Sequence, residues 1–183
     1  MSQITKKALA VSLKELLNRK SLSKITVRDV VESCGVNRQT FYYHFKDIYD
    51  LLEWTFTQDI DRAFHEQTDN LNWQEWCAIL ISYMKENKKL ILNVCNSIER
   101  KRLEEHIKLW MAPAIEKLIE SFSEGKDYKE ENKAFVKNIY SIMLQGLLMQ
   151  WIENDMADEK LKNLDKIFML MDGSLNFMLE KLD

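Results

Sequence analysis

The sequence contains very little glycine and proline. Its 183 residues include four Gly and one Pro, whereas Met, Leu, Lys and Glu are plentiful. Folds built from short strands need Gly and Pro at their turns, and those residues are missing here. With 46% hydrophobic residues, the chain can still bury a substantial core. The composition therefore predicts an all-α protein.

The sequence also lacks the residue groups that zinc sites, disulfide frameworks and membrane spans need. Cys34, Cys77 and Cys95 are widely spaced and form no Cys-x-x-Cys pair. The polar N-terminus has no apolar stretch of signal-peptide length. The most apolar segment, residues 135–152, holds a lysine and several amides, which indicates a buried helix and not a membrane span. We expect reduced thiols, no metal or cofactor, no membrane contact and a cytoplasmic protein.

Catalytic motifs are missing as well. The three histidines are far apart, and there is no HExxH, GxSxG, P-loop or GxGxxG motif. Asp59 and Asp61 lie two positions apart, so on a helix they face different sides and are better interpreted as solvated. We therefore expect no enzyme.

Charge is divided unevenly along the chain. The net charge is −3, yet residues 1–50 hold nine Lys/Arg and five Asp/Glu, a net of +4, which leaves −7 for the rest. A basic N-terminal part on an acidic body predicts that any contact with phosphate groups lies at the N-terminus. Chance clustering is the alternative explanation.

Two short helices broken by a glycine are predicted near the N-terminus. Thr26 can cap the first helix, and an acidic residue three positions later is close to a capping-box arrangement. Gly35 would end that helix with a positive φ. Asn37 can cap the second helix, in which Phe41 and Phe45 lie four residues apart and turn towards the core.

The second helix exposes an unusual set of side chains. With the phenylalanines inward, the more exposed side chains are Arg38, Gln39, Thr40, Tyr42, Tyr43 and His44, with no acidic residue among them. Arg pairs with guanine, Gln pairs with adenine, and hydroxyl groups contact phosphates. Adjacent aromatic side chains are also uncommon on a bare surface. The pattern predicts a helix that enters the DNA major groove, although helix-turn-helix shapes also occur in proteins that bind no DNA.

The sequence is Thr-Val-Arg-Asp-Val from residue 26 and Cys-Gly-Val-Asn-Arg-Gln-Thr-Phe-Tyr-Tyr-His-Phe-Lys from residue 34. Both runs resemble the N-terminal domain of the TetR family of bacterial transcription regulators, and the match covers about residues 5–52. Residues 146–154 are similar to a stretch common in the family's penultimate helix. In two departures, Cys34 replaces the usual Ala, and Ile48 stands where many members have a Lys.

The resemblance implies that ten residues of this segment bind DNA. Some would contact phosphate, some would read base edges, and others would fix the helix on the backbone. The phosphate contacts are Thr26 and Arg28, the base-reading residues are Arg38, Gln39 and Tyr43, the positioning residues are Thr40, Tyr42, His44 and Lys46, and the capping Asn37 completes the set.

The C-terminal part predicts two helices with coiled-coil-type seams. Apolar residues alternate at spacings of three and four in residues 161–182, and residues 135–149 repeat the pattern. Two such helices can pair with those of a second copy as a four-helix bundle. The expected dimer contacts are Ile139, Ile142, Gly146, Met149, Leu164, Phe168, Met171, Leu175 and Met178. The alternative is that both helices pack only within one chain.

Between these parts, residues 73–87, 90–97 and 99–122 are expected to be helical. Pro113 should kink or split the last of these helices. Five Trp and nine Met residues either line an effector cavity or form ordinary core, and ordinary core is the more common arrangement.

Taken together, the sequence predicts an all-α homodimeric transcription regulator. Residues 1–47 would form a helix-turn-helix DNA-binding domain, and residues 48–183 a helical domain for effector binding and dimerisation. The dimer would bind a palindromic operator with half-sites about one helical turn apart. A small-molecule effector or a coregulator protein would change the separation of the two DNA-binding domains. The alternative is a helical protein-interaction module without DNA binding.

A finer resemblance concerns the regulated genes. Residues 37–42 and 51–54 are similar to a subgroup of regulators of dihydroxyacetone kinase operons. In that subgroup the helical domain that follows the DNA-binding domain can respond to a protein partner instead of a small ligand. The resemblance therefore implies that the chain regulates dihydroxyacetone kinase genes.

Overall fold

The structure, a computed structural model, describes residues 2–65, 71–123 and 125–182. Within these ranges every regular element is a helix, so the all-α prediction is confirmed. In chain order the elements are α1 (Ser2–Leu17), η1 (Leu22–Lys24), α2 (Val27–Cys34), α3 (Arg38–His44), α4 (Ile48–His65), α5 (Trp73–Glu86), α6 (Lys88–Cys95), α7 (Arg100–Ser123), α8 (Glu130–Glu153), η2 (Asp158–Leu161) and α9 (Leu164–Leu182).

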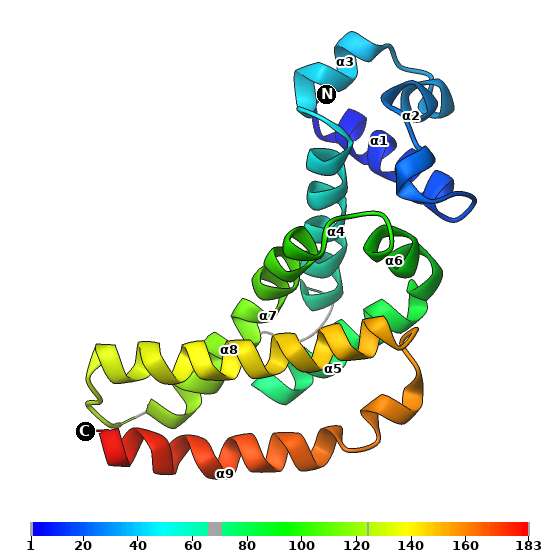
Figure 1. The fold of residues 1–183 in the computed structure, drawn as a ribbon. Coiled ribbons are helices and arrows are strands. Elements are labelled where there is room, and N and C mark those ends of the chain that lie inside the picture. Colours follow the sequence, from blue (N-terminus) through cyan, green and yellow to red (C-terminus); the bar gives the residue numbers. More distant parts are fainter. Residues whose placement is uncertain (1, 66–70, 124, 183) are drawn as a thin grey trace.

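Helices α1 to α3 form a group at one end of the molecule, and α4 runs from this group into the body (Figure 1). Leu9 and Leu13 of α1 and Phe41 of α3 are fully buried in the core of the group. Burial of each such side chain contributes about 1.5–3 kcal/mol of transfer free energy. This small core fixes how α2 and α3 are presented.

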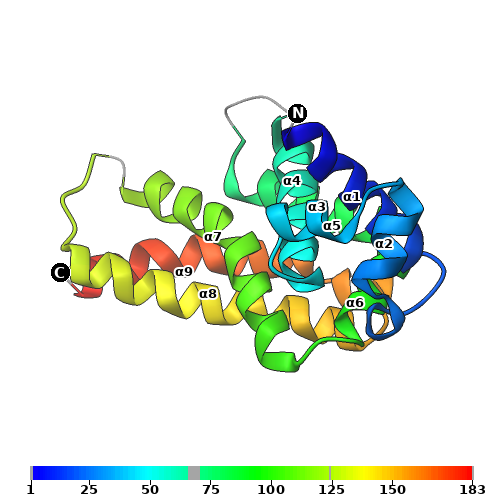
Figure 2. The ribbon, with the colours of Figure 1, turned by 90° about the horizontal axis from the view of Figure 1, so that it is seen from above.

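The body is built around two long antiparallel helices, α8 and α9, which lie side by side (Figures 1 and 2). Helix α9 is attached to α5 through Asp172, whose carboxylate accepts hydrogen bonds from Trp73 Nε1 (3.0 Å) and Gln74 Nε2 (2.8 Å). The hydroxyl groups of Tyr140 on α8 and Ser174 on α9 share a hydrogen bond of 2.8 Å. These polar contacts fix the position of α9 on the body.

Helix α7 connects the body to α4. It packs against α8, α5 and α4, and the ring of Trp110 lies 5.5 Å from that of Phe56 on α4. Pro113 lies inside α7 and does not split it, so the split that was one expected outcome does not occur. A proline removes the hydrogen bond to the carbonyl four residues earlier, here that of Leu109. The Leu109 side chain is exposed, so water has access to this turn of the helix.

Two further expectations concern cysteines and membranes. Cys34, Cys77 and Cys95 are free thiols. In the described part of the chain, no helix is both long enough and apolar enough to cross a membrane.

Candidate nucleic-acid interface

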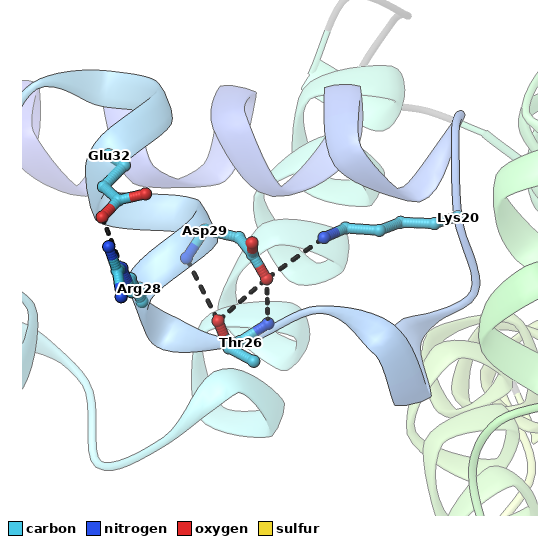
Figure 3. A network of polar contacts seen from close by, with 5 residues as sticks. All are labelled: Lys20, Thr26, Arg28, Asp29 and Glu32. Atoms are coloured by element: carbon cyan, nitrogen blue, oxygen red, sulfur yellow. Dashed lines mark hydrogen bonds and ion pairs between the residues drawn. The ribbon is translucent and has the colours of Figure 1, made fainter.

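The first helix of the predicted helix-turn-helix begins with the expected cap. The Thr26 hydroxyl accepts a hydrogen bond from the Asp29 backbone N–H (3.2 Å), and the Asp29 carboxylate accepts one from the Thr26 N–H (2.7 Å), which completes a capping box (Figure 3). Lys20 Nζ lies 3.1 Å from the same carboxylate. The hydrogen bonds from Thr26, followed by that from Lys20, lower the pKa of Asp29 from 3.8 to about 2.

A left-handed glycine makes the turn between the two helices. Gly35 has φ +70°, a conformation that costs glycine little because it has no Cβ atom. Asn37 then caps α3, because its Oδ1 accepts hydrogen bonds from the backbone N–H (2.8 Å) and the hydroxyl (3.0 Å) of Thr40. The sequence predictions for Thr26, Gly35 and Asn37 as local structural residues are confirmed.

Helix α3 is anchored from one side only. Phe41 and Phe45 are buried, and their ring centroids are 6.0 Å apart. Lys6 of α1 lies over the Phe45 ring at 5.5 Å and over the Trp54 ring of α4 at 5.7 Å. Contacts from α1 and α4 therefore hold the inner face of a helix that is only seven residues long.

The opposite face of α3 points to solvent. Tyr42 is 59% exposed and Tyr43 is 82% exposed. Arg38 and Gln39, in the first turn, are also exposed, whereas Thr40 and His44 are half-buried at the edges. Helix α3 lies at the far end of the molecule from α8 and α9, so the body leaves this face open (Figure 1). The structure therefore brings the α3 residues of the predicted site together on one accessible surface.

The two predicted phosphate-binding side chains at the start of α2 already form hydrogen bonds within the chain. Thr26 is exposed, but its hydroxyl already takes part in the capping box. Arg28 Nε donates a hydrogen bond to Glu32 Oε1 at 2.6 Å, and this bond, together with the charge of Glu32, raises the pKa of Arg28 (Figure 3). A phosphate group would have to compete with Glu32 for the Arg28 guanidinium.

The start of α4 differs from the family pattern in a way that the structure explains. Ile48 is 9% exposed and belongs to the core, so this position has no side chain to offer to phosphate. Asp47 caps α4 by accepting from the N–H groups of Tyr49 (2.8 Å) and Asp50 (2.9 Å). The Lys46 side chain is exposed and directly precedes this cap. Among the cations of the predicted site, Lys46 lies nearest in the sequence to the start of α4.

One contact that sequence reasoning missed joins this unit to the body. The Arg102 guanidinium of α7 lies over the Tyr49 ring of α4 at 4.5 Å, a cation–π contact. The two residues are far apart in the chain, so no local pattern could have indicated the pair. Tyr49 follows the end of α3 by only a few residues, which places a body side chain close to the helix-turn-helix unit.

The residues predicted to contact a second copy differ in how exposed they are in the single chain. Ile139 and Ile142 of α8 are 39% and 59% exposed, and Gly146 is exposed beside them. By contrast, Met149 and Leu175 are buried inside the single chain.

Three more seam residues on α9, Leu164, Phe168 and Met178, are half-buried. Phe168 packs edge-on against Trp73 of α5, with ring centroids 4.7 Å apart. Met171 is buried. Because Met149, Met171 and Leu175 have no surface to offer a second copy, their assignment to the interface is corrected, and they are core residues of one chain.

A different face of α9 is open. Met169, Leu170 and Phe177 are 71%, 70% and 60% exposed, and Gly173 lies between them. On α8 the exposed apolar face also includes Phe135 and Met143. We call these two exposed apolar faces the α8/α9 surface: Phe135, Ile139, Ile142, Met143 and Gly146 of α8, with Met169, Leu170, Gly173 and Phe177 of α9.

An apolar pocket lies in the body between α5, α7, α8 and the start of α9. The space inside it that a water-sized molecule can occupy is about 50 Å³. Cys77, Leu80, Met111, Leu144 and Trp151 are among the buried side chains that line it. Elsewhere in the described residues, no group of three or more His, Cys, Asp and Glu side chains is placed to hold a metal ion.

Comparison with known families matches both parts of the chain. Residues 12–54 match the family described as "Bacterial regulatory proteins, tetR family". Residues 71–173, more than half of the chain, match the family described as "Transcriptional regulator C-terminal region" of the TetR type.

Individual relatives agree with this result. The chain is 32% identical over 87 residues to the HTH-type dhaKLM operon transcriptional activator DhaS of Lactococcus lactis subsp. lactis (strain IL1403). That alignment covers 48% of this chain and spans about half, 46%, of the length of the relative.

Two solved structures share the fold. The dihydroxyacetone kinase operon activator DhaS superimposes with a TM-score of 0.72 at 23% identity, over 95% of this chain and 97% of that one. A TetR transcriptional regulator from Streptococcus agalactiae 2603V superimposes with a TM-score of 0.50 at 24% identity, over 85% and 90% of the two chains.

Proposed function

The chain belongs to the TetR family of bacterial regulatory proteins, and from this premise we propose that it binds a specific DNA operator as a homodimer. The observation that carries the proposal is the outer face of α3, where Arg38, Gln39, Tyr42 and Tyr43 are exposed with no acidic residue among them. The proposed division of the chain is residues 1–47 for DNA binding and residues 48–183 for dimerisation and sensing.

The geometry of α3 supports specific roles at the DNA. In helix-turn-helix proteins the N-terminal residues of the second helix lie closest to the base edges. Arg38 and Gln39 occupy those positions, and each can make paired hydrogen bonds to a purine. Tyr43 projects further along the same face, whereas Thr40 and His44 at the edges suit the backbone. The buried phenylalanines hold α3 in place before binding, so little conformational entropy is lost on the DNA.

The α8/α9 surface supports the dimer. Seven large apolar side chains are exposed on it, and single chains seldom leave such a patch uncovered. A Cβ atom added at Gly146 or Gly173 would meet nothing within 4 Å in the single chain. These glycines would therefore let the helices of a second copy approach closely in a four-helix bundle. A two-fold dimer of this kind presents two copies of α3, which suits a palindromic operator.

The regulated genes and the signal form the finer part of the proposal. The Lactococcus relative is named as an activator of the dhaKLM operon, and the solved DhaS structure is named as a dihydroxyacetone kinase operon activator. We propose that this chain also regulates dihydroxyacetone kinase genes. The body would receive a small-molecule effector or a coregulator protein. Helix α7, which contacts both the pocket and α4, would pass the signal to the DNA-binding domains.

Selection of operators from random duplex DNA tests the proposal. The full-length protein should enrich a palindromic sequence, and such a site should lie upstream of dihydroxyacetone kinase genes. Arg38→Ala should cost about 1–3 kcal/mol on that site and relax the base preference at one position of each half-site. Lys46→Ala should weaken all sequences alike and reduce the salt slope by about one. Lys162→Ala, an exposed lysine of the body, is the matched control. Selection of no sequence would contradict the proposed function.

A further inference from the structure

A largely buried carboxylate joins the group of α1 to α3 to the body. Asp59 Oδ2 of α4 lies 2.6 Å from Nζ of Lys14 on α1, and it accepts a hydrogen bond from the Tyr83 hydroxyl of α5 at 3.1 Å. The Asp59 side chain is 11% exposed, so its interpretation as a solvated carboxylate is wrong, whereas Asp61 is exposed. One carboxylate therefore connects three helices, of which α1 belongs to the DNA-binding end and α5 to the body.

The chemistry of these three groups makes the contact directional. Burial, followed by the negative charge of Asp59, raises the pKa of Tyr83 above its ordinary value, so the phenol stays protonated and remains a donor. Hydrogen bonds to a charged group are short and require a narrow range of angles. Apolar contacts, by contrast, are non-directional. The contact of Asp59 with Lys14 and Tyr83 therefore fixes the position of α1 on α4 and α5 more sharply than the apolar core does.

The same end of α1 has a second polar tie to the body. Asn93 Nδ2 of α6 donates a hydrogen bond of 2.7 Å to the carbonyl of Leu17, the last residue of α1. Beside the ion pair, a crevice between α1 and α4 is lined by Val11 and Gln58, among others, and a water-sized molecule can occupy about 150 Å³ of it. Packing is incomplete at this level of the α1–α4 seam, which leaves the polar ties to set how α1 is held.

The distance from Asp59 to α3 turns a small rotation into a large displacement. Asp59 follows Ile48, the first residue of α4, by 11 residues, which is about 16 Å along the helix axis at ~1.5 Å per residue. A swing of about 10° at the level of Asp59 would move the α3 end by about 3 Å, close to the ~3.4 Å rise of one base pair. In a two-fold dimer both α3 helices move, so their separation would change by up to about 6 Å.

We propose that Asp59 is a positioning residue for operator recognition: through Lys14 and Tyr83 it fixes the angle of the group of α1 to α3 on the body, and it thereby determines which half-site spacing the dimer accepts. The proposal rests on the proposed function and deepens it, because it assigns the choice of spacing to residues that touch no DNA. The exposed face of α3 would still determine the bases within each half-site. Base preference and spacing preference would therefore depend on different residues.

Operators with altered spacers test the proposal. The spacer between the selected half-sites is lengthened or shortened by one base pair, and fluorescence anisotropy with the full-length protein gives the affinity for each duplex. The original protein should discriminate against both altered spacers by at least about tenfold, because a rigid dimer fits one separation of half-sites. Asp59→Asn keeps the shape of the side chain and removes its charge, and it should reduce this discrimination to about threefold or less. Each ratio compares two duplexes with one protein preparation, so partial unfolding cancels.

Variants of the other two groups and an exposed carboxylate complete the test. Asp61→Asn, two positions away on the same helix, is the matched control and should keep the original ratio. Lys14→Met and Tyr83→Phe should each lower spacer discrimination, and neither should lower it further when Asp59 is already Asn, because all three act through one contact. Tyr83→Phe removes a single hydroxyl group, so it keeps the test decisive if Asp59→Asn does not fold.

Three results would each overturn the proposal. The first is equal affinity of the original protein for all three spacers, and the second is unchanged discrimination in Lys14→Met and Tyr83→Phe. The third is an altered base preference within the half-sites of Asp59→Asn, which would mean general damage to the DNA-binding end. An original protein that selects no operator contradicts the proposed function itself, and that failure is visible before any variant is compared.

Discussion

The ion pair between Arg28 and Glu32 makes a quantitative prediction about DNA binding. Glu32 holds the Arg28 guanidinium at 2.6 Å and places a negative charge on the surface proposed to face phosphate groups. Replacing Glu32 with Gln should free Arg28 for one additional phosphate contact. The substitution should therefore raise affinity for all DNA sequences at low salt, without changing which sequence is preferred.

The size of the effect follows from counterion release. Both side chains are more than 60% exposed, so loss of their ion pair should leave the free energy of unfolding nearly unchanged. One further phosphate contact steepens the slope of log K against log salt by about 0.9. Between about 50 mM and about 200 mM salt, the advantage of Glu32→Gln over the original protein should therefore shrink about threefold.

Fluorescence anisotropy with a labelled operator, measured across that range of salt, provides the assay. Glu116→Gln, which removes an exposed carboxylate from the body, should leave the slope unchanged. Glu32→Gln should also have no effect on the slope when Arg28 is already Ala, because the two changes act through one contact. Identical slopes for Glu32→Gln and the original protein would refute the placement of Arg28 at phosphate.

Three further predictions concern stability and assembly. Phe41→Ala, at a fully buried anchor of α3, should lower the free energy of unfolding in urea by about 3–5 kcal/mol, whereas Tyr43→Ala on the exposed face should change it by about 0.5 kcal/mol or less. Ile142→Glu on the α8/α9 surface should give a monomer in light scattering, whereas Leu175→Ala should lower stability without changing the mass; the reverse pattern would contradict the proposed interface. The folded-state pKa of Asp29, about 2, lies below its ordinary value of 3.8. The Asp29 carboxylate therefore stabilises the fold above about pH 4, and this stabilisation is lost as the pH falls through 2. Asp29→Asn should remove this part of the pH dependence of the thermal unfolding temperature.

The parts of the structure that the sequence predicted best are those set by neighbouring residues. The capping box at Thr26, the left-handed turn at Gly35 and the cap at Asn37 each involve atoms within four residues along the chain. Such interactions depend little on the rest of the fold. The inward placement of Phe41 and Phe45 also follows from helix geometry alone, and it determined which side of α3 is exposed.

The faces of α9 could not be assigned in the same way. The helix carries two apolar stripes, one through Met171 and Leu175 and another through Leu170 and Phe177. A heptad-like spacing is the same whether the partner is another helix of one chain or a second copy. The choice depends on Asp172, which accepts hydrogen bonds from α5 residues nearly a hundred positions earlier. Contacts of that range leave no pattern in a single sequence.

Two successive residues of α7, Trp110 and Met111, contact different parts of the molecule. Met111 lines the pocket, and Trp110 packs on Phe56 of α4. Neighbouring side chains project about 100° apart around a helix axis, so one rigid rod touches both regions on different sides. A roll of about 10° moves atoms that lie ~5 Å from the axis by roughly 1 Å. A change in the space around Met111 that rolled α7 would therefore move Trp110 against α4 by a similar distance.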